Sequence, residues 1–170
     1  MDPRLQELLD HHEIRQLLAR YAHGCDRGDA TVMGGVYAEE SWDDHGPNKC
    51  DGRSFAAIIT DDLVAHGTMC SHLMGQSLII VDGDAARAET YFLASISNRP
   101  GDPDATMHQL GGRYIDTLTR AAGTWKIARR ICVRDWSASQ PVRADWLQGA
   151  GFVGGCLGAD DPGAALMRIR

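Results

Sequence analysis

The sequence lacks the features that mark several large classes of protein. Its longest apolar runs, residues 55–59 and 78–81, fall far short of the roughly 20 residues that a membrane-spanning helix needs. It has no basic excess, because 17 Lys and Arg stand against 23 Asp and Glu, and so it lacks the footprint of a nucleic-acid-binding protein. GxGxxG, P-loop and GxSxG motifs are also missing. We therefore expect no nucleotide or redox cofactor, no nucleic-acid partner and no membrane span.

Cysteine is present, but not in the pattern of a disulfide framework or a zinc site. The five cysteines are an odd number, and no pair has CxxC spacing. Residues 1–4 are polar and contain no apolar signal core. These features predict a cytoplasmic protein with reduced, mostly buried cysteines and no bound metal.

The first third of the chain has the pattern of helices. Apolar residues recur at helical spacing from Leu5 to Cys25, and Gly28 is expected to end this first helix. Asp29 can cap a short second helix that extends through residue 37. The turn-rich residues 41–52 predict an irregular loop with at most one short strand, and a third helix is expected over about residues 53–66.

From residue 68 the apolar period changes from 3.6 to 2, which indicates strands. We predict four strands, over residues 68–81, 85–97, 106–120 and 124–136. A hairpin turn at Asp82-Gly83, a loop over 98–104 and a tight turn over 121–123 connect them in that order. Helices followed by a four-strand antiparallel meander predict an α+β fold, in which a curved sheet wraps around the helices and leaves an internal pocket.

Residues 138–170 differ in composition from residues 1–137, which we expect to form one domain. The segment is rich in glycine and carries a few apolar anchors, among them Trp146, Phe152 and Leu166. It is predicted to be either a flexible end or an extension that covers the pocket or a neighbouring subunit.

Three segments resemble the SnoaL-like branch of the NTF2-like superfamily. Residues 14–21 followed by Asp26 are similar to its first helix, and residues 112–120 and 123–130 to its last two strands. The resemblance spans roughly residues 5–137 and implies an NTF2-like cone, with N-terminal helices packed on a curved antiparallel sheet. This superfamily includes scytalone dehydratase, bile-acid 7α-dehydratase and hexachlorocyclohexane dehydrochlorinase, together with isomerases, cyclases and non-catalytic binders, so the fold leaves the function open.

Asp26 and His72 are the pair with the clearest chemistry. In the dehydratase and dehydrochlorinase members, an Asp at the end of the first helix orients a His on the first long strand, and these two residues resemble that pair. Strand alternation puts His72 on the more apolar face of its strand, with Cys70, Met74, Leu78 and Ile80. A neutral imidazole can abstract a proton near pH 7, while a carboxylate on its other nitrogen fixes the tautomer. The alternative is a core histidine and a helix-end aspartate that perform no chemistry.

The resemblance also implies roles for Tyr21 and Arg130. A tyrosine at this spacing before Asp26 can polarise a carbonyl or a leaving group, and a buried arginine on the last strand can stabilise a developing anion. Alternation puts Arg130 on the face opposite Trp125 and Ile127. Either Arg130 faces the pocket and those apolar residues pack elsewhere, or a bulge changes the phase of the strand.

Three further residues are candidates for substrate contact. His108 shares its strand phase with apolar neighbours, His45 lies on the expected rim loop, and Met74 lies on the same face as His72. The alternative for His108 is a paired core histidine, and the alternative for His45 is a solvated loop histidine.

The combined prediction is a cofactor-independent lyase that removes water or halide from a small cyclic or polycyclic apolar substrate. An isomerase or cyclase of the same fold, a non-catalytic small-ligand-binding protein and a structural oxygenase β subunit are the alternatives. Members with this fold form dimers or trimers, so a homodimer or homotrimer is expected.

Overall fold

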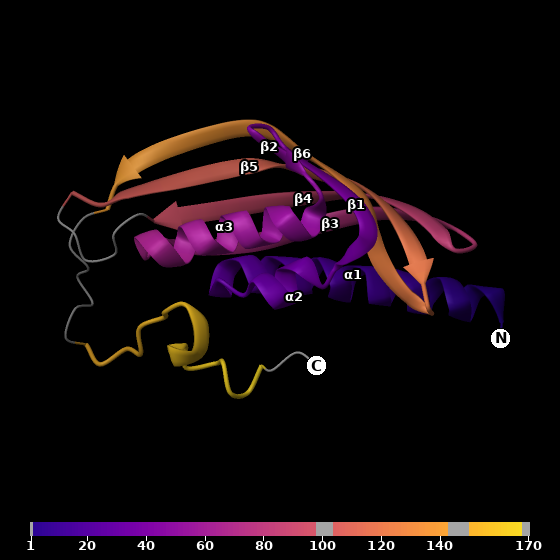
Figure 1. Cartoon of the computed structure of the whole chain (residues 1–170), viewed down its shortest axis with the longest axis horizontal. Coiled ribbons are helices and arrows are strands. Elements are labelled where there is room, and N and C mark those ends of the chain that lie inside the picture. The colour runs from indigo at the N-terminus through magenta and orange to yellow at the C-terminus, as the bar shows by residue number, and fades with distance from the viewer. Residues whose placement is uncertain (1, 98–103, 143–149, 168–170) are drawn as a thin grey trace.

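The computed structural model describes residues 2–97, 104–142 and 150–167. A curved sheet carries the helices on its concave side (Figure 1). The elements are α1 (Pro3–Arg27), α2 (Ala30–Gly34), β1 (Tyr37–His45), β2 (Asn48–Cys50), α3 (Gly52–His66), β3 (Met69–Asp82), β4 (Ala85–Ser97), β5 (Thr106–Ala121), β6 (Thr124–Pro141) and the 3₁₀ helix η1 (Gly158–Asp160).

The described strands form one open, mixed sheet in the order β2-β1-β6-β5-β4-β3. The predicted meander of β3 to β6 is antiparallel throughout, whereas β1 joins β6 in parallel. The α+β cone fold predicted from the sequence is therefore confirmed.

The prediction of a loop over residues 41–52 was wrong. Most of that segment belongs to β1 and β2, which pair across a tight turn at Gly46. The helix expected to extend through residue 37 ends at Gly34, and Tyr37 begins β1. The buried positions of β1 include a polar residue, Asp43, so the strand shows no apolar alternation in the sequence.

Short polar side chains and glycines fix the helix ends, as the sequence indicates. Asp2 accepts a hydrogen bond from the Arg4 backbone N–H, and Gly28 ends α1 with a φ of 67°. Asp29 caps α2 by accepting from the Val32 N–H at 2.9 Å. Among the described residues, no helix is long and apolar enough to cross a bilayer.

A bulge in β3 changes which of its residues face the helices. The register between β3 and β4 shifts just after Met74, so the side-chain alternation reverses beyond it. Leu78 and Ile80, predicted to share the face of His72, are both exposed, and Ile79 is buried in their place. The prediction was wrong for these residues because it assumed an unbroken period of 2.

A second bulge, in β6, settles the alternation question at Arg130. Ala128 is passed over in the pairing of β6 with β5. Trp125 and Ile127 before the bulge, and Arg130 after it, are therefore all buried on the same side of the sheet. The second alternative from the sequence, a change of strand phase, is the one found.

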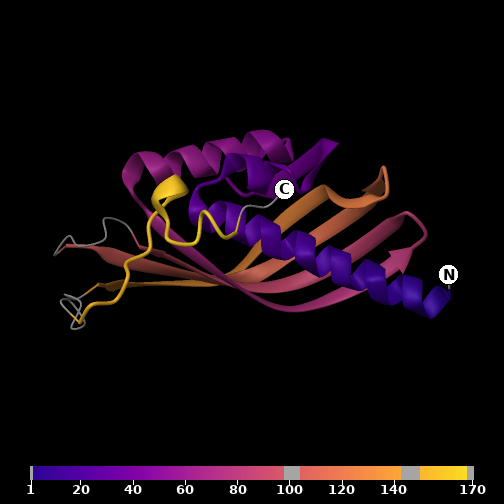
Figure 2. The ribbon, with the colours of Figure 1, turned by 90° about the horizontal axis from the view of Figure 1, so that it is seen from below.

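The C-terminal segment returns toward the helices (Figure 2). β6 extends to residue 141, five residues beyond the predicted end, and residues 150–167 then run past α1 and α2. Leu157 packs against the core, and Asp161 pairs with the Arg27 guanidinium at 3.2 Å. Phe152 and Leu166 are exposed, and Trp146 lies outside the described residues.

The outer face of the sheet carries large exposed apolar side chains on neighbouring strands: Leu73, Leu78, Ile80, Tyr91 and Ile115. Such a face is typical of a surface that another chain covers. The homodimer or homotrimer expected from the sequence stays a prediction.

The contact between α1 and α2 depends on Gly24. A Cβ at this position would lie 2.4 Å from the Met33 backbone nitrogen. Because this is too close for two non-bonded atoms, one of the two helices would have to move. We expect Gly24→Ala to lower the free energy of unfolding, measured in urea, by about 1–3 kcal/mol. Gly34→Ala is the matched control, because its Cβ would make only ordinary contacts, with the Ala56 Cβ at 3.6 Å and with Arg53 Cα and Cγ at 3.8 Å. Equal losses in the two variants would show that the close approach at Gly24 is unimportant.

Candidate active site

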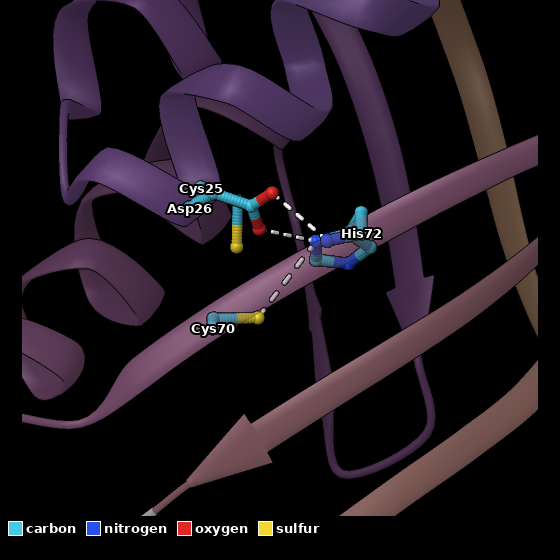
Figure 3. A group of neighbouring side chains, drawn as sticks. All are labelled: Cys25, Asp26, Cys70 and His72. Atoms are coloured by element: carbon cyan, nitrogen blue, oxygen red, sulfur yellow. Dashed lines mark hydrogen bonds and ion pairs between the residues drawn. The ribbon is translucent and has the colours of Figure 1, made fainter. Parts of the chain in front are cut away.

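Asp26 and His72 meet where the end of α1 crosses β3 (Figure 3). One carboxylate oxygen of Asp26, Oδ1, lies 2.7 Å from His72 Nδ1. The other, Oδ2, accepts the backbone N–H of His72 at 2.8 Å. Their side chains are only 12% and 7% exposed. This two-point contact fixes the imidazole plane and leaves Nε2 as the ring nitrogen that can accept a proton from a substrate.

The environment of His72 favours its protonated form. Burial of the ring acts against the charge, but the hydrogen bonds of the ring with Asp26 and Cys70 outweigh it and raise the pKa of His72 to about 9. The carboxylate therefore stabilises the imidazolium that proton abstraction would form. The raised pKa also means that the neutral form of His72 becomes abundant only at alkaline pH.

Aromatic rings surround the imidazole. The rings of Tyr21 and Phe92 each lie 6.4 Å from that of His72, the tyrosine nearly edge-on. Tyr114 stacks on Phe92 with ring centres 4.3 Å apart. Burial raises the pKa of the Tyr21 and Tyr114 hydroxyls well above the ordinary value, so both stay neutral donors.

Arg130 lies at the centre of this cluster. Its Nε and Nη2 donate hydrogen bonds to the Asp116 carboxylate on β5, at 2.8 Å and 2.7 Å. Neither side chain is exposed. The guanidinium carbon lies 4.1 Å from the ring centres of both Tyr21 and Tyr114. Although burial opposes its charge, Asp116 raises the pKa of Arg130, which stays positive. Its Nη1 is buried and has no hydrogen-bond partner among the described residues.

A second Asp–His pair lies on β1. His45 Nδ1 contacts the Asp43 carboxylate, which also accepts a hydrogen bond from the Tyr37 hydroxyl. The imidazole stacks on Phe55, and its Nε2 is 3.3 Å from the Tyr21 hydroxyl. Tyr21 thus joins the two pairs, with His72 beside its ring and His45 at its hydroxyl.

The structure does not bring every predicted residue to this cluster. His108 is half-buried on β5, where its Nδ1 lies 2.7 Å from Ser139 Oγ on β6. Met74 is partly buried and lines a hollow of about 410 Å³ between α1 and β3. Among the described residues, Tyr21, His45 and Arg130 lie with the Asp26–His72 pair, while His108 contacts β6 instead.

Four of the hollows on the described part of the molecule have volumes from about 410 to 710 Å³. The hollow of about 710 Å³ lies between the end of α1, α2 and the C-terminal segment. Neither Asp26 nor His72 lines any of the four, so the internal pocket expected at His72 stays a prediction.

Sequence reasoning missed two buried carboxylates, Asp43 and Asp116. Asp116 lies in the same strand phase as Tyr114 and Leu118, and a carboxylate among inward-facing apolar residues signals a buried cation partner. Asp43 stands two residues before His45, a spacing that puts both on one face of a strand. That signal was hidden because the segment had been assigned to a loop.

Comparisons with known proteins agree with the architecture. The SnoaL-like domain family matches residues 6–131. A search of curated proteins found no match.

Solved structures with this fold come from several bacteria. A protein from Novosphingobium aromaticivorans, named as a proposed scytalone dehydratase, is 21% identical over 81% of this chain and 92% of its own, with a TM-score of 0.69. The hexachlorocyclohexane dehydrochlorinase LinA-type3 from Novosphingobium barchaimii is 14% identical over 83% and 97%, with a TM-score of 0.71. An NTF2-like protein with a cystatin-like fold from N. aromaticivorans is 26% identical over 78% and 86%, with a TM-score of 0.58.

Proposed function

The chain belongs to the SnoaL-like domain family, and on that premise we propose that it is a cofactor-independent lyase of the dehydratase or dehydrohalogenase type. The observation that carries the proposal is the two-point contact of Asp26 with His72, which fixes the ring and frees Nε2. A buried carboxylate that holds both the ring and the backbone of a histidine is the arrangement that general-base catalysis needs.

The proposed reaction is a 1,2-elimination. His72 Nε2 takes a proton from a carbon next to the breaking carbon–oxygen or carbon–halogen bond. The electrons of the C–H bond form the new double bond, and the leaving group departs with its bonding pair as hydroxide or halide. Asp26 stabilises the imidazolium, which afterwards returns its proton to solvent or to the hydroxide.

Arg130 and Tyr21 are the proposed partners of the leaving group. The buried Arg130 Nη1 has a hydrogen to donate and no described acceptor. Placing a preorganised cation where negative charge develops is a large contribution to catalysis in a site that excludes water. Tyr21 supplies a neutral hydroxyl, and its ring centre lies 4.1 Å from the carbon of the same guanidinium.

The aromatic neighbours of His72 support the proposed substrate class. The rings of Tyr21 and Phe92 lie beside His72, with Tyr114 stacked on Phe92, and these rings favour a small cyclic or polycyclic apolar molecule. The names of two structural relatives, a hexachlorocyclohexane dehydrochlorinase and a proposed scytalone dehydratase, belong to lyases acting on cyclic molecules, and they guide the choice of compounds to test.

We propose that the protein acts in a reducing compartment, the cytoplasm. All five cysteines are free thiols, and Cys25 and Cys70 lie buried beside the candidate site. A disulfide between Cys25 and Cys70 would place two oxidised sulfur atoms against His72.

The proposal is tested by incubating the protein with a panel of hydroxylated and halogenated cyclic compounds. We expect release of water or halide together with a new double bond, followed by mass spectrometry or ion chromatography. Exchange of substrate hydrogen for deuterium without loss of a group would instead indicate an isomerase. Saturable binding with neither change would indicate a non-catalytic binder.

The rate of elimination should rise with pH. The base acts only when neutral, and its pKa in the folded protein is raised to about 9, so kcat/KM should increase about 50-fold from pH 7 to pH 9 and level off above.

Asp26→Asn is the matched variant for this profile. Without the carboxylate, the midpoint should move down toward the ordinary histidine value, while the plateau falls because the imidazolium is less stabilised. A profile that falls between pH 7 and pH 9, or a midpoint that the variant leaves in place, would contradict the assignment of His72 as the base.

A further inference from the structure

Two buried thiols lie against the Asp26–His72 pair, and the proposed reaction uses neither. Cys25 directly precedes Asp26 on α1, and Cys70 lies two residues before His72 on the same face of β3. Cys70 Sγ is 3.7 Å from His72 Nδ1. Figure 3 shows all four side chains converging on one point from the helix end and the strand.

The four side chains place two sulfurs, one nitrogen and one carboxylate oxygen within 4.8 Å of one another. In a tetrahedral zinc site, bonds of about 2.0–2.3 Å put neighbouring ligand atoms roughly 3.3–3.8 Å apart. To surround an ion, the widest pairs would therefore have to close by about 1–1.5 Å, and the 2.7 Å pair of Asp26 Oδ1 and His72 Nδ1 would have to open by about 0.6 Å. Cys25 and Cys70 are only 5% and 4% exposed, so an ion bound there would be shielded from water.

We propose that Cys25, Asp26, Cys70 and His72 form a binding site for a soft divalent cation, Zn²⁺ or Cd²⁺. Thiolate and imidazole ligands favour these ions over Mg²⁺ and Ca²⁺, which prefer all-oxygen sites. Binding would form two metal–sulfur bonds and release the two thiol protons and, where the imidazole is protonated, one of its two ring protons. The hydrogen bond with Cys25 and burial raise the pKa of the Cys70 thiol, so the metal-free cluster holds Cys70 as a neutral thiol.

The sequence prediction of no metal site rested on the absence of CxxC spacing. Here the ligands instead come as two local pairs, Cys25-Asp26 and Cys70-x-His72, 44 residues apart at their nearest ends. The crossing of α1 and β3 is what assembles them, so no spacing rule within one segment would have found the site.

Metal binding and general-base catalysis exclude one another at His72. This part of the inference rests on the proposed function of His72 as a base. As a base, the imidazole carries its hydrogen on Nδ1, donates it to Asp26 Oδ1 and keeps Nε2 free. As a ligand, it must give the Nδ1 lone pair to the ion, so the hydrogen moves to Nε2 and the base is lost. An ion in this site would therefore inhibit the enzyme.

Cadmium titration of the metal-free, reduced protein tests the site itself. We expect one equivalent to bind, with the ultraviolet charge-transfer absorption of cadmium thiolate. Cys70→Ser should weaken the affinity by more than the roughly 10- to 100-fold that loss of an outer-shell partner costs. Cys132→Ser, which removes a half-buried thiol on β6 outside the cluster, should leave binding unchanged.

X-ray absorption on the zinc-loaded wild-type protein keeps the test independent of how any variant folds. It should show two sulfur and two nitrogen or oxygen ligands. Absence of a tight equivalent, ligation without sulfur, or equal weakening by Cys132→Ser would overturn the proposal.

Activity separates this inference from the proposed function. One equivalent of Zn²⁺ should abolish elimination, and a chelator should restore it. Tight thiolate binding without any elimination activity would remove the proposed function and leave the metal site standing. Full activity of the loaded protein would refute the exclusion at His72.

Discussion

Replacing His72 with alanine is expected to lower kcat/KM for elimination by about 10²–10⁴-fold, the range that a positioned general base contributes. The fold should survive the change, because Asp26 keeps its hydrogen bond from the backbone N–H of residue 72 at 2.8 Å. Circular dichroism and the urea midpoint check that survival, and product release measures the rate.

His66→Ala is the matched control for that loss. His66 lies at the exposed end of α3, where its Nδ1 contacts the Asp62 backbone carbonyl oxygen, and its side chain is 69% exposed. The control should keep full activity. If His72→Ala also kept full activity, the base would be another group, and the Asp43–His45 pair on the far side of Tyr21 would be the next candidate.

The largest loss of stability is expected at the buried ion pair. Asp116→Ala leaves the fully buried Arg130 charged and without either of its two hydrogen bonds to the carboxylate. Breaking such a pair from one side costs about 3–5 kcal/mol, because the remaining charge is left without its partner in the interior. Urea denaturation followed by circular dichroism measures the change.

A surface ion pair on the neighbouring part of the sheet supplies the comparison. Asp135 contacts Arg113 at 3.3 Å, and its side chain is 42% exposed. Asp135→Ala should therefore lower the free energy of unfolding by about 0–1 kcal/mol. A loss at Asp116 no greater than this would mean that Arg130 is not held mainly by Asp116.

The sequence was sufficient for the features that local chemistry determines. Asp29 caps α2 because a short carboxylate can accept from the free N–H groups at a helix start. Gly28 ends α1 because glycine adopts the positive φ that this position requires. The long strands follow from a sustained period of 2. Asp26 and His72 were identified from their resemblance to a known pair, and the structure brings them into contact.

The features that the sequence concealed depend on pairing between strands. The bulges after Met74 and at Ala128 are visible only once the neighbouring strand fixes the register, and they reverse the faces of Ile79 and Arg130. The role of Asp43 was hidden for a related reason, because a strand whose buried positions include a carboxylate carries no apolar alternation.

The most direct test of the account is a crystal structure with a halogenated or hydroxylated cyclic ligand bound. The decisive quantity is the distance from His72 Nε2 to the carbon whose proton is lost. The account predicts about 3–3.5 Å, the separation of a near-attack complex, with Asp26 still on Nδ1 and Arg130 Nη1 beside the leaving group. A ligand seated instead in the hollow between α1, α2 and the C-terminal segment, with His72 enclosed by its aromatic neighbours, would contradict it.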